Sequence, residues 1–301
     1  MTTRPTRATA DGRAYLDLQN LARRTSRPTD ELHQLYCLEG FLARLAASPH
    51  SASLVLKGGV LLAAYGARRP TRDVDLQGRR LSNDSDMVLR IVQDVAASNL
   101  GDGLVFDGGQ AKAETIRDED DYTGVRVTLS CGLAAARLSM HVDVSVGDPI
   151  WPAPTTITLP RLLDGQITLS GYPLPMVHAE KIVTAIQRGV ANTRWRDFAD
   201  VYLLARHHNI DGQELRTAIE HVAGYRQARI RPLAAVLDGY APVAQSRWFA
   251  WRRKNRLDDR LPEQFAIILR DVIAFADPVL TEATRRHTWI ADSLTWAVAD
   301  N

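Results

Sequence analysis

Apolar side chains recur with the period of an α-helix near the start of the chain. Within residues 30–47, leucines and Phe41 fall every three or four positions, so they line one face of a helix. Thr29 or Asp30 is expected to cap this helix, because a short polar side chain there accepts a hydrogen bond from an unpaired backbone N–H group. The same period predicts helices over residues 12–24 and 83–98.

Strict alternation of apolar and polar positions predicts a strand over residues 137–146. Every even-numbered residue from Leu138 to Val146 is apolar, and Asp143 is among the polar residues between them. The acidic run at residues 118–121 is predicted to be a solvent-facing turn. Shorter runs predict further strands over residues 53–56, 73–76 and 124–130.

The pattern changes near residue 150. Residues 151–174 contain four prolines with short strand-like pieces between them, and from Met176 onward nearly every segment has helical spacing. This change predicts an α+β fold in which a mixed-sheet domain precedes a helical domain. The expected divisions are a tail with helices at residues 1–50, an α/β domain at 51–174 and a helical domain at 175–301.

Composition narrows the class of protein. The 301 residues are 45% hydrophobic and 24% charged, which is typical of a globular protein with a substantial core. No run approaches the roughly 20 apolar residues that span a bilayer, and the N-terminus lacks the apolar segment of a secretory signal. Two cysteines, Cys37 and Cys131, cannot build a disulfide framework. We therefore expect a cytoplasmic protein without a membrane partner.

A glycine pair followed by two aspartates is the richest segment for chemistry. Alternation along the predicted strand places Asp73 and Asp75 on one face, a few ångströms apart. Two carboxylates so close repel each other unless a cation lies between them, and Mg²⁺ (or Mn²⁺) suits oxygen ligands. Gly58 and Gly59, at a strand-to-helix turn, would let a triphosphate approach backbone N–H groups.

Asp143 is a candidate third metal ligand, because it lies on the polar face of an otherwise apolar strand. Three carboxylates from two neighbouring strands can hold two metal ions, which stabilise the attacking and leaving oxygens of phosphoryl transfer. Each feature is commonplace alone, since most D-x-D pairs, glycine pairs and strand aspartates simply face solvent. Their order, spacing and placement together favour a nucleotidyltransferase site.

These motifs resemble the AbiEii/AbiGii family of nucleotidyltransferase-like toxins. That family belongs to the DNA polymerase β superfamily and is found in type IV toxin–antitoxin and phage-defence modules. Gly58 and Gly59 followed by Asp73 and Asp75 match its first motif, and Asp143 matches the single acidic residue of its second. The resemblance implies a polymerase β-type domain, metal ions held by the three aspartates, and an NTP substrate. Gly59 replaces the phosphate-binding serine of many superfamily members.

The third family motif is a lysine, an arginine seven residues later, and then R-D-x-x-D. Lys181, Arg188, Asp197 and Asp200 match it. The resemblance implies that Lys181 and Arg188 bind the nucleotide, and that Asp197 has a direct role in the site. The residues alone leave another interpretation open, in which Lys181 forms a structural ion pair with Asp197 or a neighbour of Glu180.

Residues 216–260 combine many basic residues with interleaved aromatic ones. Arginines that bind phosphates and rings that stack on bases are the components of single-stranded nucleic-acid binding. The alternative is a solvated helical surface with buried rings. Some members of the resembled family add nucleotides to tRNA, which makes RNA, and tRNA in particular, the expected acceptor. The candidates include Arg252, Arg253, Arg256, Trp248 and Trp251.

Three hypotheses from different classes remain. The chain is a toxin enzyme that transfers nucleotides from an NTP to RNA and blocks growth, with a cognate antitoxin protein as partner. Alternatively, it is a nucleotidyltransferase that modifies a small molecule or a protein side chain. The third possibility is a non-catalytic RNA-binding module, against which the intact carboxylates argue. The basic and aromatic C-terminal half favours the first hypothesis over the second.

Overall fold

A computed structural model describes residues 4–117 and 123–299 of the chain. The acidic run at residues 118–121 lies outside the described residues. The chain forms two compact units. The first comprises Met1–Gly147 with Thr155–Gly171, and the second comprises Asp148–Pro154 with Tyr172–Asn301.

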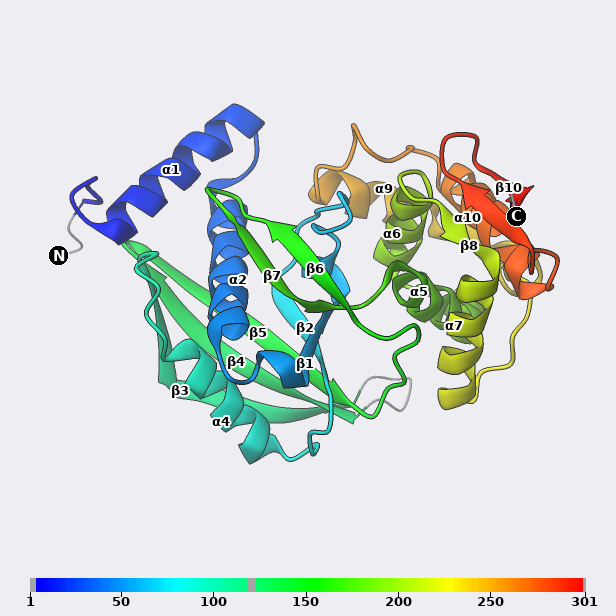
Figure 1. Cartoon of the computed structure of the whole chain (residues 1–301). Coiled ribbons are helices and arrows are strands. Elements are labelled where there is room, and N and C mark those ends of the chain that lie inside the picture. Colours follow the sequence, from blue (N-terminus) through cyan, green and yellow to red (C-terminus); the bar gives the residue numbers. More distant parts are fainter. Residues whose placement is uncertain (1–3, 118–122, 300–301) are drawn as a thin grey trace. The chain divides into compact units, whose positions relative to one another are not determined.

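A mixed seven-stranded sheet organises the first unit (Figure 1). Its strand order is β3-β4-β5-β2-β1-β7-β6. The pairs β2/β5 and β1/β7 are parallel, and the other neighbours are antiparallel. The strands are β1 (Leu54–Lys57), β2 (Asp73–Gly78), β3 (Leu104–Arg117), β4 (Thr123–Leu133), β5 (Ala136–Val146), β6 (Thr155–Pro160) and β7 (Gln166–Gly171).

Helix α2 covers the apolar face of this sheet. The Sγ atom of Cys37 in α2 lies 3.7 Å from Sδ of Met140 in β5, and the rings of Phe41 and Phe106 meet edge to face. The helix begins at Thr29 after Pro28, and no side chain caps it, so the predicted cap was wrong. The helices of this unit are α1 (Ala10–Thr25), α2 (Thr29–Ala47), α3 (Gly58–Leu61) and α4 (Ser85–Ala96).

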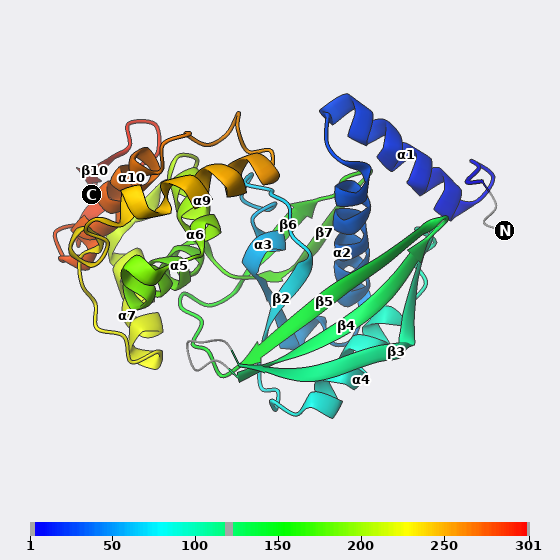
Figure 2. The same ribbon diagram turned by 180° about the vertical axis from the view of Figure 1, so that it is seen from behind.

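The opposite face of β3, β4 and β5 carries the polar side chains. Even-numbered residues of β5 such as Met140 and Val142 are buried, whereas Ser139 is exposed and Asp143 is half-buried. Figure 2 shows this side of the sheet, with β5, β4 and β3 in front of α2. The alternation predicted from the sequence is therefore confirmed, and it sets Asp143 on the polar side.

The second unit is mainly helical, as expected. Its core is aromatic: Phe265 packs edge to face against Phe198 and Tyr240, with ring centroids 5.6 Å apart in each pair. Its helices of at least four residues are α5 (Leu174–Arg188), α6 (Trp195–Ala205), α7 (Gly212–Tyr225), α8 (Leu233–Val236), α9 (Tyr240–Lys254) and α10 (Phe265–Leu280).

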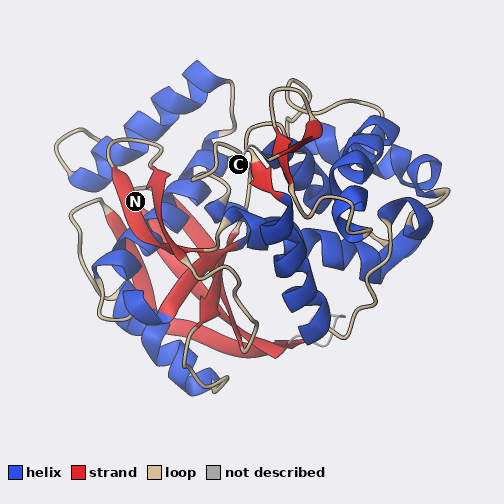
Figure 3. Cartoon of the chain, turned by 45° about the vertical axis from the view of Figure 1, so that its right-hand side comes forward, coloured by secondary structure: helices blue, strands red, loops and turns tan. Residues whose placement is uncertain are grey.

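A small antiparallel sheet in the second unit was not predicted (Figure 3). It consists of β8 (Ile210–Asp211), β9 (His287–Ile290) and β10 (Thr295–Val298). Its order is β10-β9-β8, and Trp289 of β9 is 3% exposed. Strands this short carry too few residues for alternation to be visible, so only burial of Trp289 explains their pairing.

Within the described ranges, every helix lacks the length or the apolar character that crossing a bilayer requires. The α+β class predicted from the sequence is confirmed by the mixed sheet and the helical second unit.

Candidate active site

The register of two parallel strands brings the predicted carboxylates together. Asp75 of β2 is the direct partner of Asp143 of β5, and Asp73 is the partner of His141. Partners in neighbouring strands project from the same face, with Cβ atoms about 4.5–5.5 Å apart. Asp73, Asp75 and Asp143 therefore share the polar face of the sheet. His141, which accompanies them and lies 3.1 Å from the hydroxyl of Thr128, was not predicted.

The glycine pair lies against Asp75. Gly58 has a φ of +68°, and a Cβ atom there would lie 1.9 Å from Oδ2 of Asp75, so no side chain fits. The backbone N–H of Gly59 donates to the same Oδ2 atom, at 3.4 Å. The two halves of the first motif are thus one packed unit, although they are separated along the chain.

Arg126 holds Asp143, and this contact was missed. Its Nε and Nη2 atoms donate to Oδ1 and Oδ2 of Asp143 at 2.8 and 2.7 Å, a bidentate pair. These hydrogen bonds raise the pKa of Arg126 further above its usual value. The side chains are 32% and 16% exposed, so water reaches the pair. Once the structure places the two-residue turn between Leu133 and Ala136, counting back from it puts Arg126 opposite Asp143.

A row of charged residues crosses five strands at this level of the sheet. Asp75 and Asp143 stand at its centre. Lys57 is the partner of Asp75 on the outer side, and Arg126 is the partner of Asp143. Glu114 of β3 follows Arg126 and is exposed. The flanking cations offset the repulsion between the two central carboxylates.

The donor set suits a hard divalent cation, because it consists of carboxylate oxygens on one face. Among residues 4–117 and 123–299, however, no group of three or more His, Cys, Asp or Glu side chains is arranged to hold a metal ion. Both oxygens of Asp143 are engaged by the guanidinium of Arg126. The residues therefore fit a metal ion on condition that Arg126 gives up Asp143.

The third motif forms an ion-pair cluster inside the second unit. The Nζ atom of Lys181 in α5 lies 3.1 Å from Oδ1 of Asp197 and 2.7 Å from Oδ2 of Asp200, both in α6. Arg194 donates to the other oxygen of Asp197, at 2.6 Å. Burial alone would raise the pKa of Asp197, but Lys181 and Arg194 outweigh it, and the pKa lies well below its usual value. Arg188 occupies the last turn of α5.

This geometry bears on the two interpretations of Lys181. Asp197 and Asp200 are 4% and 1% exposed, and both form ion pairs with the ammonium of Lys181. The structural ion pair that the residues alone left open is therefore present. A role for Lys181 in binding nucleotide remains a prediction. In that role, the ammonium would have to contact the nucleotide while it is paired with two carboxylates.

One buried histidine near this cluster was overlooked. His178 of α5 is fully buried, and neither ring nitrogen has a hydrogen-bond partner. Its ring packs against Phe275, with centroids 4.8 Å apart. Burial, and next the charge of Lys181, lower the pKa of His178 to about 3. The ring is therefore neutral in the folded protein near pH 7.

The basic and aromatic segment is partly core. Trp248 is fully buried, and its Nε1–H donates to the carbonyl of Pro262 at 3.1 Å. Arg252 is also buried, donates to the carbonyl of Leu261 at 2.7 Å and pairs with Asp258 at 2.9 Å. Of the two interpretations left open, burial favours a core ring for Trp248, and it leaves Arg252 hydrogen-bonded within the fold. The exposed cations of this stretch include Arg247, Arg253, Lys254 and Arg256.

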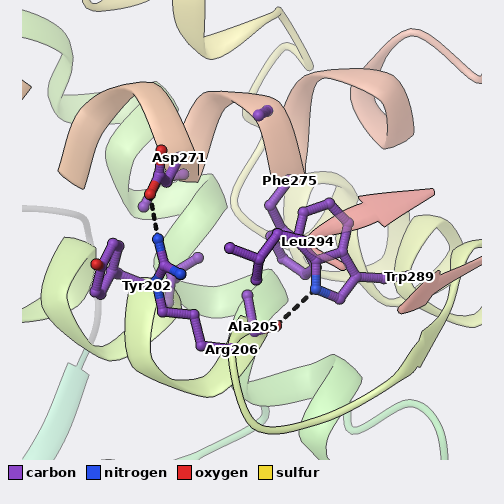
Figure 4. A pocket seen from close by; sticks show the side chains of 10 residues that line it. Tyr202, Ala205, Arg206, Asp271, Phe275, Trp289 and Leu294 are labelled. Atoms are coloured by element: carbon purple, nitrogen blue, oxygen red, sulfur yellow. Dashed lines mark hydrogen bonds and ion pairs between the residues drawn. The ribbon is translucent and has the colours of Figure 1, made fainter. Parts of the chain in front are cut away.

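A small pocket of about 60 Å³ also lies within the second unit (Figure 4). Its wall is mostly apolar, with Phe275, Leu294 and Trp289, whose Nε1–H donates to the carbonyl of Ala205 at 2.6 Å. Arg206 at its mouth pairs with Asp271 and lies 4.2 Å from the ring centroid of Tyr202. None of the predicted site residues lines this pocket.

Comparison with known proteins supplies the family. Curated proteins give no match. Two crystal structures from Helicobacter pylori each match 84% of this chain with a TM-score of 0.49. One is JHP933, at 16% identity over 94% of that chain, and the other is a candidate nucleotidyltransferase, at 15% identity over 97%. The sequence profile of the nucleotidyl transferase AbiEii toxin of type IV toxin–antitoxin systems matches residues 40–293. The chain belongs to this AbiEii nucleotidyltransferase toxin family.

Proposed function

We propose that this toxin is a metal-dependent nucleotidyltransferase that moves nucleotides from an NTP to an RNA acceptor, the 3′ end of a tRNA, and so blocks translation and growth. The observation that carries the proposal is the direct pairing of Asp75 with Asp143, with Asp73 on the same face. Carboxylates so placed are costly for the fold alone, because like charges on adjacent strands repel each other. Membership of the family implies an antitoxin partner.

Asp73, Asp75 and Asp143 would hold Mg²⁺ or Mn²⁺, which would stabilise charge on the attacking and leaving oxygens of phosphoryl transfer. The lack of side chains at Gly58 and Gly59 lets Asp75 pack against the backbone, and the phosphates would bind beside this turn. A carboxylate of the trio accepts the proton of the acceptor hydroxyl.

Lys181 and Arg188 are proposed to bind phosphate oxygens of the NTP, and Asp197 to orient the lysine. Support for this orientation comes from the contact of 3.1 Å between Lys181 and Asp197. The compact charge of an ammonium suits a triphosphate.

Exposed cations around α9 support RNA as the acceptor. Arg247, Arg253, Lys254 and Arg256 are exposed, and Arg253 lies over the ring of Phe249 at 5.5 Å. Such residues bind phosphates without reading sequence, which suits an acceptor recognised by its backbone.

The direct test incubates the protein with each labelled NTP and total RNA, and then separates RNA, protein and small molecules. We expect label in RNA of tRNA size with the wild type and none with Asp75→Asn. Label in the protein or small-molecule fraction would instead favour the second hypothesis. Binding of RNA without any labelled product would favour the non-catalytic module.

A further inference from the structure

We infer that Arg126 is a displaceable cation: it pairs with Asp143, and it moves toward Glu114 when a divalent cation binds Asp143. This inference rests on the proposed function, because it assumes a metal site at Asp73, Asp75 and Asp143. Arg126 acts as a positioning residue, since it determines when Asp143 is available.

Arg126 already engages both carboxylate oxygens of Asp143. A carboxylate that accepts two charge-assisted hydrogen bonds has both oxygens directed at the guanidinium. A metal ion on Asp143 requires at least one of these oxygens. The metal ion and Arg126 therefore compete for the same atoms.

A divalent cation can displace Arg126 from Asp143. Arg126 is 32% exposed, so water weakens its attraction to Asp143 and can solvate the guanidinium when it leaves. A divalent cation between Asp75 and Asp143 interacts with two carboxylates at once, whereas Arg126 is bidentate with only one. Displacement is thus a modest cost set against a larger gain.

Glu114 gives Arg126 a second carboxylate on a neighbouring strand. Arg126 stands between Asp143 on β5 and Glu114 on β3, as the direct cross-strand partner of each. Glu114 is exposed on the same face and already acts electrostatically on Arg126. The guanidinium can therefore leave Asp143 without losing all of its pairing.

The test measures Mn²⁺ binding to the whole protein in the absence of NTP, by the electron paramagnetic resonance signal of free Mn²⁺. Arg126→Gln should bind Mn²⁺ about fivefold more tightly than the wild type, which corresponds to about 1 kcal/mol. Glu114→Gln should weaken binding about twofold, because the displaced guanidinium then lacks its cross-strand carboxylate on β3. Unchanged or weaker binding by Arg126→Gln would overturn the inference.

A double-mutant cycle separates competition from a general loss of positive charge. Asp143→Asn should weaken Mn²⁺ binding in both backgrounds, but about fivefold more in Arg126→Gln than in the wild type, so that Arg126→Gln no longer binds Mn²⁺ more tightly once residue 143 is Asn. Arg137→Gln is the matched charge control, because Arg137 lies on β5, is exposed and hydrogen-bonds only to the carbonyls of Ala134 and Ala136 among the described contacts. An equal gain in Arg137→Gln would also overturn the inference.

Two further variants keep the result interpretable. Arg126→Lys retains the charge but loses the bidentate fork, and should give an intermediate affinity even if Arg126→Gln folds poorly. Asp75→Asn should weaken Mn²⁺ binding in every background. If it does not, the proposed metal site itself is wrong, whereas weakening by Asp75→Asn without a gain in Arg126→Gln refutes only the role of Arg126.

Discussion

Two ion-pair clusters in this molecule differ in how much of their side-chain surface is exposed to water. On the sheet of the first unit, the Arg126–Asp143 pair is 32% and 16% exposed. In the second unit, the side chains of Asp197 and Asp200 are 5% and 1% exposed around Lys181. A pair open to solvent can exchange partners at modest cost, whereas removing one member of a buried pair strands the other charge. The comparison predicts that substitutions in the open cluster affect nucleotide transfer more than stability, and that substitutions in the buried cluster lower stability.

The largest effect is expected at the open cluster. Asp75→Asn should lower nucleotide transfer by more than about 100-fold, since even partners outside the ligand shell contribute up to this much. Thermal melting should change little, because Asp75 is only partly buried. Initial rates with labelled NTP and a melting curve check both. Activity within a few-fold of the wild type would remove Asp75 from the site.

The buried cluster should respond in the opposite sense. Lys181→Met leaves Asp197 and Asp200 without their shared ammonium, and should cost about 3–5 kcal/mol of unfolding free energy. Urea unfolding monitored by circular dichroism measures this loss.

The matched control for this variant is Lys181→Met combined with Asp197→Asn and Asp200→Asn, which removes the stranded charges and should recover part of the stability. If Lys181→Met is as stable as the wild type but fails to bind NTP, Lys181 belongs with the chemistry rather than with the fold.

His178 offers a test by pH within the second unit. Its pKa is lowered from 6.5 to about 3, so the folded protein holds the neutral ring while the unfolded chain takes up a proton. The stabilising contribution is complete above pH 6.5 and is lost as the pH falls toward 3, with a slope approaching 1.4 kcal/mol per pH unit, roughly. The slope arises from burial together with Lys181 and His208, while Asp200 opposes them.

Urea unfolding of the wild type and of His178→Leu, at several values between pH 4 and pH 7.5, isolates this slope from that of the carboxylates. We expect a shallower dependence in His178→Leu, and no change in His207→Gln, which alters an exposed histidine. Parallel curves for wild type and His178→Leu would show that the ring is not the titrating group.

The smallest effects should come from single cations of α9. Arg253→Gln should weaken RNA binding and flatten its salt dependence by about one phosphate contact, without changing stability. Arg252→Gln should instead lower stability, because Arg252 is buried and hydrogen-bonds to Leu261 and Asp258. Filter binding at several salt concentrations, together with melting curves, compares the two. If RNA affinity falls in Arg252→Gln alone, the exposed face of α9 does not bind RNA.

Periodicity predicted much of the fold and part of the site. Helix and strand periods located α2, α4 and β5, and alternation correctly placed Asp73 and Asp75 on one face. Local patterns suffice for such features because each depends on a single element.

Pairing between elements is less visible in the sequence. Asp75 meets Asp143 through a parallel pair formed after α4, β3 and β4 have intervened, so no local signal specifies it. Arg126 was overlooked because the turn at Ala134, with a φ of +48°, lacks the glycine or asparagine that usually identifies a tight hairpin. The place of Trp248 stayed open because composition does not distinguish a ring that stacks on a base from one that fills the core.

Substitution of Gly58 is expected to inactivate this chain. The smallest side chain that replaces it, a methyl group, would overlap the carboxylate of Asp75. A random library selected for cells that survive expression should therefore yield substitutions of Gly58 as readily as substitutions of Asp75, although Gly58 carries no functional group. Survivors with Gly58→Ala would contain a folded, full-length and inactive protein. Such a variant would be a useful antigen or bait for finding the antitoxin without killing the host.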